Sequence, residues 1–496
     1  MNHNSLVDAL RQSVGAGPDR PAIHAAGAVW SYADLWARSG WIGSALLRRV
    51  GLRPGDRVGI LGHNDPGYLA AYFGILRAGC VAVPLNQFLR ADELADQLEL
   101  VGAHLCLVGV IDGATVDTVS RRVRAVAIDD LLDEFDAPLP PIDPRSDATI
   151  LLTSGTTGTP KGAVQTHATM GHATAELRAA LPFSSQDVML AFLPFFAAIP
   201  EQILPTLLTG GAIEVLPRFE LAAVEEACNR VTTFDAVPTL MARILDGVDH
   251  ARLARLQWLM FASEPMPPSL LFAWWETMPA VRTYEFYGMT EMLTITVATP
   301  DTLRRAPGSV GLPFPGSTVS VVDAEGRSAA VGESGEVVCA SPARMRGYLP
   351  DGIDPQTWSL PSGAMRTGDL GRLDEGGHLV LTGRIKDLII SGGMNIAPTE
   401  IEAVAASHPG VASAMAVGIP DARWGETPIV VAIPKRGSSL TPAELLAYCR
   451  ERLAAYKRPS GAALVERFPM TGIGKSSKAA LRDEILNGDL EIVHAG

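Results

Sequence analysis

The chain has 496 residues, of which 47% are hydrophobic and 19% are charged, and its formal net charge at pH 7 is −13. This length suits two or three domains with a large core. The negative charge argues against general nucleic-acid binding, which requires a basic surface. No apolar run reaches the roughly 18 residues that a membrane helix needs, so we expect no membrane insertion.

The amino-terminal residues and the cysteines predict a cytoplasmic protein. A basic stretch followed by an apolar one is lacking at the amino terminus, so we expect no signal peptide. The five cysteines are scattered without a CxxC pair, which fits reduced thiols better than disulfides or a metal cluster. The sequence is compatible with a homodimer but does not determine the oligomeric state.

Short apolar strands alternate with helix-like segments through roughly the first 340 residues. One example is a strand at 57–61, a helix at 67–77 and a strand at 80–85. This alternation predicts βαβ units and therefore an α/β fold, with a large amino-terminal domain of parallel-rich sheets. The proline-rich segment 136–144 predicts a surface connection.

The pattern changes in the last third of the chain. Residues 317–379 show short strands and glycine turns, which predict a small β-rich module. Beyond residue 384 a new unit begins, with helix-like segments at 398–406 and 441–455. We therefore predict two domains, residues 1–384 and residues 385–496, the second a small α+β domain.

The charge differs between these two predicted domains. Residues 385–496 carry 12 basic and 12 acidic side chains, so the preceding residues hold the whole net charge of −13. Within the neutral part, residues 423–458 include seven basic and three acidic side chains. This segment is either a solvent-exposed face of mixed charge or a surface that binds the phosphates of a thiol partner.

Residues 151–162 read LLTSGTTGTPKG, an apolar strand that enters a loop of Ser, Thr and Gly with Lys161 near its end. Glycines let backbone N–H groups approach an anion, hydroxyls donate further hydrogen bonds, and the lysine adds positive charge. The spacing is not that of a Walker A loop. By itself, this segment is compatible with a flexible turn or with a loop that binds a polyphosphate. Further motifs elsewhere in the chain favour the polyphosphate-binding loop.

The segment TSGTTGTPKG resembles the phosphate loop of the adenylate-forming superfamily, which includes acyl-CoA synthetases, stand-alone adenylation enzymes and luciferases. Five further segments resemble the motifs of that family in the same order: Tyr287-Gly288-Met289-Thr290-Glu291, Gly335-Glu336 with Gly347-Tyr348, Arg366-Thr367-Gly368-Asp369, Gly383-Arg384-Ile385-Lys386-Asp387 with Ser391-Gly392-Gly393-Met394-Asn395-Ile396, and Pro469-Met470-Thr471 with Gly474-Lys475. The resemblance covers nearly the whole chain. It implies an AMP-forming ligase that makes an acyl-adenylate and pyrophosphate from ATP and a small carboxylic acid, then passes the acyl group to a thiol.

The resemblance also implies which residues serve the first half-reaction. Attack of a carboxylate on ATP brings two anions together, so positive charge is needed in the transition state. The implied catalytic residues are Lys475, which stabilises the carboxylate and α-phosphate, Glu291, which holds Mg²⁺, and Thr290. The implied ATP-binding residues are Thr153, Ser154, Gly155, Thr156, Thr157, Gly158, Lys161, Ser263, Glu264, Pro265, Tyr287, Gly288, Asp369 and Arg384.

Within that set, Tyr287 is expected to stack on adenine. The carboxylate of Asp369 is expected to accept hydrogen bonds from the ribose hydroxyls, with Arg384 on the same nucleotide; the alternative is that the two form a structural ion pair. Ser263-Glu264-Pro265 is an atypical form of the adenine turn of the family.

The family rotates its small carboxy-terminal domain between the two half-reactions, and Lys386 matches the pivot position. One orientation would bring Lys475 to the adenylation site. The other would place Gly392 and Gly393 beside the incoming thiol. That thiol belongs to CoA or to the phosphopantetheine of a carrier protein, which share the same reacting arm.

Two departures from the family pattern bear on the acid. Ala197, after Phe196, stands where many acyl- and aryl-CoA synthetases have a histidine and α-amino-acid adenylation domains an aspartate, which argues against an α-amino acid. Asp235 lies in an apolar run, where a carboxylate without a partner is costly to bury. A substrate ammonium would supply that partner; alternatively, Asp235 caps the following helix. Thr294 and Phe286 are further candidates for the acid pocket.

The leading specific prediction is therefore a β-amino acid that is loaded onto an acyl carrier protein in natural-product biosynthesis. The alternative is a fatty- or aryl-acid CoA ligase. Two other classes are a luciferase-like oxygenase and a catalytically silent binding protein. The presence of Lys161, Glu291, Asp369 and Lys475 argues against a silent protein.

Overall fold

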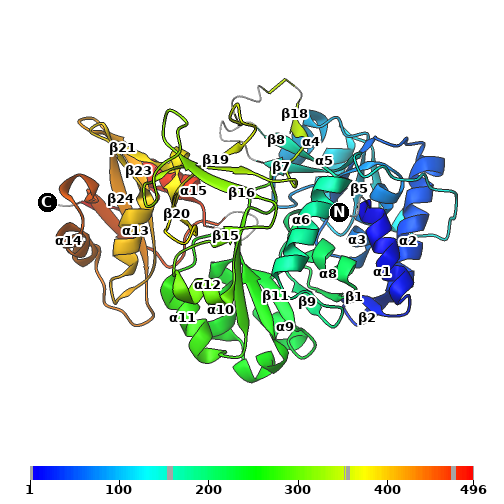
Figure 1. Ribbon diagram of the computed structural model, residues 1–496, viewed down its shortest axis with the longest axis horizontal. Coiled ribbons are helices and arrows are strands. Elements are labelled where there is room, and N and C mark those ends of the chain that lie inside the picture. Colours follow the sequence, from blue (N-terminus) through cyan, green and yellow to red (C-terminus); the bar gives the residue numbers. More distant parts are fainter. Residues whose placement is uncertain (1–3, 154–159, 351, 354–357, 471–475, 495–496) are drawn as a thin grey trace. The chain divides into compact units, whose positions relative to one another are not determined.

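The computed structural model describes residues 4–153, 160–350, 352–353, 358–470 and 476–494 (Figure 1). The chain forms two compact units: Met1–Val319 with Cys339–Gly363, and Ser320–Val338 with Ala364–Gly496. The predicted domain boundary after residue 384 stays a prediction. Within the described residues, no helix is long and apolar enough to cross a membrane.

A nine-stranded sheet of the first unit has the order β15-β14-β13-β12-β11-β9-β10-β1-β2. Its neighbouring strands β9, β11, β12 and β13 are parallel, which confirms the predicted βαβ organisation. The strands are β1 (Pro21–Ala25), β2 (Ala28–Ser31), β9 (Val188–Ala191), β10 (Ala212–Val215), β11 (Thr233–Ala236), β12 (Trp258–Phe261), β13 (Arg282–Tyr287), β14 (Thr296–Ala298) and β15 (Leu312–Pro313).

A seven-stranded sheet of the same unit has the order β18-β8-β7-β4-β3-β5-β6. Its first βαβ unit, β3–α3–β4, matches the predicted strand, helix and strand to within one residue at each end. The strands are β3 (Arg57–Leu61), β4 (Val81–Pro84), β5 (Leu105–Val108), β6 (Ala125–Ala127), β7 (Asp147–Thr153), β8 (Lys161–Thr166) and β18 (Gly347–Leu349).

Helices pack on these sheets, and their starts follow from capping residues in the sequence. Ser5 and Asp8 form a capping box at α1, and Asp65 followed by Pro66 begins α3. Every residue from Gly67 to Leu76 in α3 is buried, which explains why its sequence is apolar all round. The helices of this unit are α1 (Leu6–Ala16), α2 (Tyr32–Ala45), α3 (Pro66–Arg77), α4 (Ala91–Leu100), α5 (Gly113–Ser120), α6 (His167–Ala180), α7 (Phe195–Ala198), α8 (Leu204–Thr209), α9 (Leu221–Ala227), α10 (Pro238–Gly247), α11 (Pro268–Thr277) and α12 (Pro300–Arg305), with the π-helical turns η1 (Leu46–Val50) and η3 (Ile199–Ile203) and the 3₁₀ turns η2 (Asp129–Leu131) and η4 (His250–Arg255).

The second unit holds most of a four-stranded sheet, β16-β17-β19-β20, which confirms the predicted β-rich module. A further sheet has the order β22-β21-β24-β25-β26, with β23 paired to β24. The strands are β16 (Thr318–Val322), β17 (Gly335–Ala340), β19 (Met365–Leu373), β20 (Leu379–Arg384), β21 (Ile389–Ser391), β22 (Met394–Ile396), β23 (Val411–Asp421), β24 (Gly425–Pro434), β25 (Gly461–Leu464) and β26 (Val493–His494).

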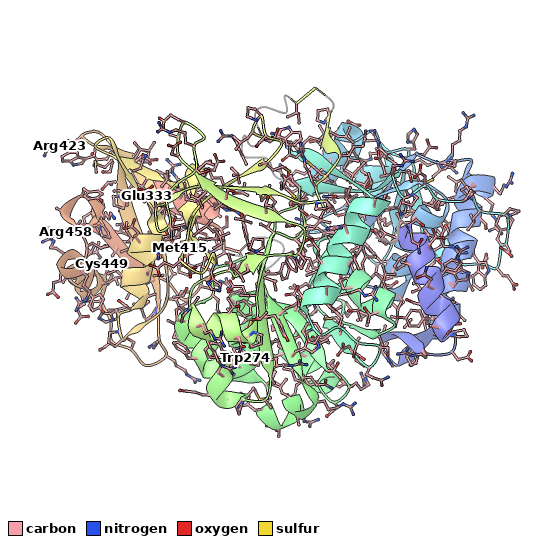
Figure 2. The ribbon with its side chains drawn as sticks, viewed as in Figure 1. Trp274, Glu333, Met415, Arg423, Cys449 and Arg458 are labelled. Carbon is pink, nitrogen blue, oxygen red and sulfur yellow. The ribbon has the colours of Figure 1, made fainter. Side chains whose placement is uncertain are left out.

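The described residues of this unit also form the helices α13 (Pro398–Ala406), α14 (Pro442–Arg452) and α15 (Lys478–Asn487), with the 3₁₀ turns η6 (Ile385–Asp387) and η7 (Ala455–Lys457). The bounds of α13 are those predicted from the sequence. Each unit has its own core: Trp274 is buried in the first, and Met415 and Cys449 are buried in the second (Figure 2).

Candidate active site

The carboxyl ends of β9, β11, β12 and β13 form one edge of the nine-stranded sheet, because these neighbouring strands are parallel. The predicted acid and adenine residues follow or end these four strands: Phe196 and Ala197 after β9, Asp235 in β11, Ser263 after β12, and Tyr287 at the end of β13. Ligands of open α/β sheets bind at such an edge. The fold therefore gathers residues that lie far apart in the sequence.

The strand register separates the acid residues from the adenine residue. Asp235 lies opposite Met260, which lies opposite Tyr284, so the three side chains share one face of the sheet. Phe286, two residues after Tyr284, points to that face, whereas Tyr287 points to the other.

The segment that carries Phe196 and Ala197 is held by a residue for which we had predicted no role. Asn64 accepts a hydrogen bond from the backbone N–H of Phe195 (2.8 Å) and donates to the carbonyl oxygen of Leu193 (2.9 Å). Asn64 is buried, and both sides of its amide group are used. The start of α7 is therefore fixed by a side chain from the loop between β3 and α3.

Asp235 is 2% exposed, and its Oδ2 accepts a hydrogen bond from Nε2 of Gln202 at 3.0 Å. Gln202 lies in the π-helical turn η3 and is fully buried. The interpretation of Asp235 as a helix cap is wrong: the N-cap of α10 is Val237, and Asp235 lies inside β11. The carboxylate thus has a partner within the protein.

The adenine turn begins with a strained residue. Ser263 has a φ of 78°, which is uncommon for a residue other than glycine. Next to it, Glu264 accepts a hydrogen bond from Oγ1 of Thr239 on α10 at 3.0 Å. The atypical Ser263-Glu264-Pro265 sequence therefore forms a bend that is anchored to a neighbouring helix.

A buried carboxylate precedes the predicted adenine-stacking residue. Glu285 lies in β13 on the same face as Tyr287 and is 7% exposed. Burial raises the pKa of Glu285 to about 8, because desolvation disfavours the charged form. The sequence pattern did not identify Glu285 as a site residue, because the strand RTYEFY is a mixed apolar run without a motif at this position.

The loop after Tyr287, which carries Thr290 and Glu291, has a strained backbone at Leu293 and a close backbone approach at Gly288. Leu293 has a φ of 59°, and a Cβ added to Gly288 would lie 1.8 Å from the carbonyl oxygen of Leu293. The hydroxyl of Thr294 donates to Oε2 of Glu176 on α6. Thr294 therefore anchors the end of the loop to α6.

The predicted phosphate loop joins β7 to β8, which pair antiparallel with Thr153 opposite Lys161. Residues 154–159, which include Ser154, Gly155, Thr156, Thr157 and Gly158, lie outside the described residues. Nζ of Lys161 lies 5.3 Å from the ring centroid of Tyr348, and the phenol of Tyr348 donates to Oε1 of Glu291 at 2.5 Å. Burial, and secondarily the Glu291 carboxylate, raises the pKa of Tyr348. Lys161 and Glu291 are thus joined through one aromatic side chain.

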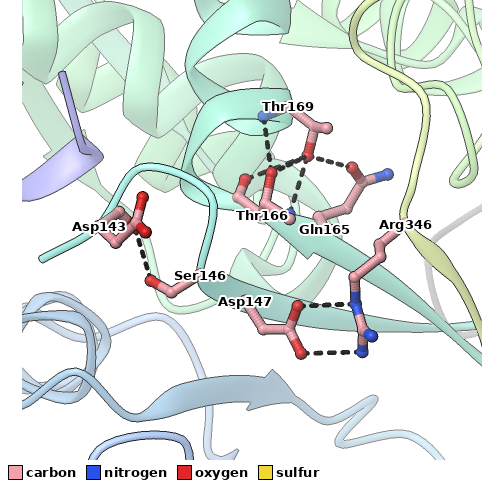
Figure 3. Close-up of polar contacts among 7 residues, drawn as sticks. All are labelled: Asp143, Ser146, Asp147, Gln165, Thr166, Thr169 and Arg346. Carbon is pink, nitrogen blue, oxygen red and sulfur yellow. Dashed lines mark hydrogen bonds and ion pairs between the residues drawn. The ribbon is translucent and has the colours of Figure 1, made fainter. Parts of the chain in front are cut away.

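Gln165, whose contact with Thr169 is drawn in Figure 3, also ties the base of the phosphate hairpin to the loop that carries Thr290. Nε2 of Gln165 donates to the carbonyl oxygen of Thr290 at 2.9 Å, while its Oε1 accepts from Oγ1 of Thr169 at 2.8 Å. Thr169 and Thr166 form the capping box of α6. The start of the helix therefore orients Gln165 toward the loop.

These residues fit a magnesium ion that arrives with ATP. Among the described residues, no group of three or more His, Cys, Asp or Glu side chains could hold a metal ion by itself. Mg²⁺ commonly binds through one or two carboxylates together with substrate phosphates. Glu291 would supply such a carboxylate, and the bound ion would neutralise charge on the phosphates.

In the second unit, the predicted ribose residues are paired with each other. Asp369 lies opposite Arg384 in the β19–β20 register, and Nε of Arg384 lies 2.8 Å from Oδ1 of Asp369. Asp369 is 6% exposed, and its backbone N–H donates to Oγ1 of Thr367 at 3.0 Å. The ion pair orients the Asp369 carboxylate within the β19–β20 hairpin.

The predicted pivot and thiol residues lie close together in the sequence of this unit. Lys386 is in the 3₁₀ turn η6, and Gly392 and Gly393 turn the chain from β21 to β22 with φ values of 58° and 78°. The backbone N–H of Gly392 donates to the carbonyl oxygen of Trp424 at 2.7 Å. Lys475 lies outside the described residues.

Comparison with known proteins agrees with this arrangement. The profile of the family described as AMP-binding enzyme matches residues 10–349, and that of the AMP-binding enzyme C-terminal domain matches residues 400–475. The chain is 34% identical over 480 residues to a feruloyl-CoA synthase from Amycolatopsis sp, covering 94% of this chain and 96% of that protein. It is 32% identical over 493 residues to the fatty acid–acyl-carrier-protein ligase ScoC of Streptomyces coeruleorubidus, covering 94% and 93%.

A solved structure extends the comparison to three dimensions. O-succinylbenzoate coenzyme A synthetase (MenE) from Bacillus subtilis, in complex with ATP and magnesium ion, superposes with a TM-score of 0.84 at 29% identity, covering 96% of this chain and 99% of that one. The matches span both units of the chain. The protein therefore belongs to the AMP-binding enzyme family and is an AMP-forming carboxylate ligase of the acyl-CoA synthetase type.

Proposed function

We propose that this ligase activates a fatty or aryl acid and transfers the acyl group to CoA. One observation supports the choice of acid: the Asp235 carboxylate, which would have bound a substrate amine, accepts a hydrogen bond from buried Gln202. Phe196 and Phe286 add apolar surface around the same sheet edge. Relatives named for feruloyl and fatty acids support the same acid classes.

In the proposed reaction, Glu291 and ATP phosphates hold Mg²⁺, and Lys161 adds positive charge at the polyphosphate. Lys475 stabilises the carboxylate and α-phosphate as the acyl–phosphate bond forms and pyrophosphate leaves. Asp369 and Arg384 bind the nucleotide, and Tyr287 stacks on adenine. In the second half-reaction, the thiol attacks the acyl carbon and AMP leaves.

The β-amino acid predicted from Asp235 remains the second candidate, together with a carrier protein as acceptor. The relative named as a ligase of fatty acids and acyl carrier protein supports that acceptor, although the acid in its name is a fatty acid. CoA and a carrier protein present the same phosphopantetheine arm. The acid and the acceptor therefore need separate tests.

The acid is tested by ATP–pyrophosphate exchange with fatty, aryl, α-amino and β-amino acids, each amino acid being paired with its des-amino analogue. We expect strong exchange with a fatty or aryl acid and little gain from an amine. Strong exchange with a β-amino acid alone would overturn the proposed acid. The acceptor is tested by single-turnover transfer from the preferred acyl-AMP to CoA or to a phosphopantetheinylated carrier protein.

A further inference from the structure

The segment Met345-Arg346-Gly347-Tyr348, here named the 345–348 segment, contacts the phosphate hairpin along one side. Its last two residues begin β18, which pairs antiparallel with β8, and Tyr348 lies opposite Ala163. The backbone N–H of Arg346 donates to the carbonyl oxygen of Val164 at 2.8 Å. The segment is therefore an added strand on the hairpin that carries Lys161.

The same segment holds Glu291 at two points. The backbone N–H of Met345 donates to the carbonyl oxygen of Glu291 at 2.8 Å. The phenol of Tyr348 donates to Oε1 of that residue at 2.5 Å. The hydrogen bond to the carboxylate is of the stronger, charge-assisted kind. The 345–348 segment therefore holds both the backbone and the side chain of Glu291.

The phenol itself has little freedom. The ring of Tyr348 packs edge-on against Trp358, with centroids 5.7 Å apart, and Nζ of Lys161 lies 5.3 Å from its centroid. Arg346 forms a two-pronged ion pair with Asp147 at the start of β7, with distances of 2.9 and 3.0 Å (Figure 3). The position of the strand, and with it that of the hydroxyl, is therefore determined by contacts outside the loop of Glu291.

We propose that Tyr348 is a positioning residue that holds the Glu291 carboxylate in one rotamer for the Mg²⁺ ion of MgATP. This inference rests on the proposed role of Glu291 as the metal carboxylate. Groups that hydrogen-bond a metal ligand orient it, and their loss typically costs about 10- to 100-fold in metal affinity or activity. The 345–348 segment thus contacts both Glu291, the proposed metal carboxylate, and Lys161, the lysine of the phosphate loop.

The test is the dependence of ATP binding on free Mg²⁺, measured by isothermal titration calorimetry with wild type and Tyr348→Phe. This substitution removes one oxygen and keeps the ring. We expect the Mg²⁺ concentration at half-maximal enhancement of ATP binding to rise about 10- to 100-fold, while ATP affinity at saturating Mg²⁺ recovers to nearly that of wild type. Tyr448→Phe is the matched control, because the phenol of the half-buried Tyr448 on α14 hydrogen-bonds Ser407 in the second unit, and Tyr448 is not among the predicted ATP-binding residues.

A second variant separates positioning from a general structural effect. Glu291→Gln keeps the size of the side chain but removes its charge, and adding Tyr348→Phe to it should not change the Mg²⁺ dependence further. An unchanged Mg²⁺ dependence in Tyr348→Phe would overturn the inference, as would an equal loss of ATP affinity at every Mg²⁺ concentration. If wild type itself shows no Mg²⁺-dependent ATP binding, the proposed role of Glu291 fails instead.

Discussion

At the scale of single residues, the hydrogen-bond partner of a buried or partly buried carboxylate decides what that carboxylate does. Asp235 accepts a hydrogen bond from Gln202, which lies 33 positions away, and Glu291 accepts one from Tyr348, 57 positions away. Asp235 is buried, and an unpartnered buried charge would be costly, whereas Glu291 is only partly buried and its carboxylate is held in place by the phenol. Neither partner can be read from local sequence pattern, because the strands and turns that carry them meet only in the fold.

The role of Asp235 can be tested by Asp235→Ala. We expect the free energy of unfolding, measured with urea, to fall by about 1.5–3 kcal/mol, because a hydrogen bond to a charged group is lost. We also expect kcat/KM to change by the same factor for an amino acid and its des-amino analogue. The exposed Asp246→Ala is the control. A loss confined to the amino acid would restore the β-amino acid prediction.

At the scale of elements, the loop after β13 shows how backbone strain is maintained around a site. Leu293 has a positive φ, and Gly288 has no room for a side chain. Gln165 holds the loop at Thr290, and Glu176 holds it at Thr294. Strained conformations persist only where the surroundings determine them. Here Gln165 in β8 and Glu176 in α6 provide those surroundings.

Gly288→Ala tests whether this loop geometry matters. The new Cβ would lie 1.8 Å from the carbonyl oxygen of Leu293, so the loop must move. A displacement of about 1 Å near reacting groups can cost about 100-fold in rate, and we expect a loss of that size in ATP–pyrophosphate exchange. Gly171→Ala in α6 is the control, because a Cβ there meets no atom within 4 Å. Normal exchange in Gly288→Ala would show that the loop tolerates another path.

At the scale of the whole molecule, the family resemblance predicts that the two half-reactions use different arrangements of the carboxy-terminal part of the chain. The family resemblance predicts Lys386 as the pivot, and the structure places it in a short 3₁₀ turn between β20 and β21. A change in one or two dihedrals at such a position can rotate a domain. The rotation stays a prediction for this chain.

Lys475→Ala tests that prediction. Removing the charge should lower acyl-adenylate formation by about 100- to 1,000-fold, as for other groups that stabilise developing negative charge. Transfer from supplied acyl-AMP to the thiol should stay near the wild-type rate, since the lysine would then be withdrawn. Lys478→Ala, which removes a lysine paired with Glu402, is the control. Equal loss of both half-reactions would contradict domain rotation.

The sequence by itself determined the reaction class and the α/β architecture. Phosphate recognition needs Gly, Ser, Thr and Lys at close spacing along the chain. The segment TSGTTGTPKG and the ordered motifs after it can therefore be recognised from the sequence alone. Alternating strands and helices such as β3, α3 and β4 follow from local periodicity and capping.

Only the tertiary structure decided which side chains support those motifs. It paired Asp235 with Gln202, Glu291 with Tyr348, and Asp369 with Arg384. The physical reason is that strand register and burial bring distant segments together, and hydrogen-bond partners of buried groups are chosen by that geometry rather than by spacing along the chain.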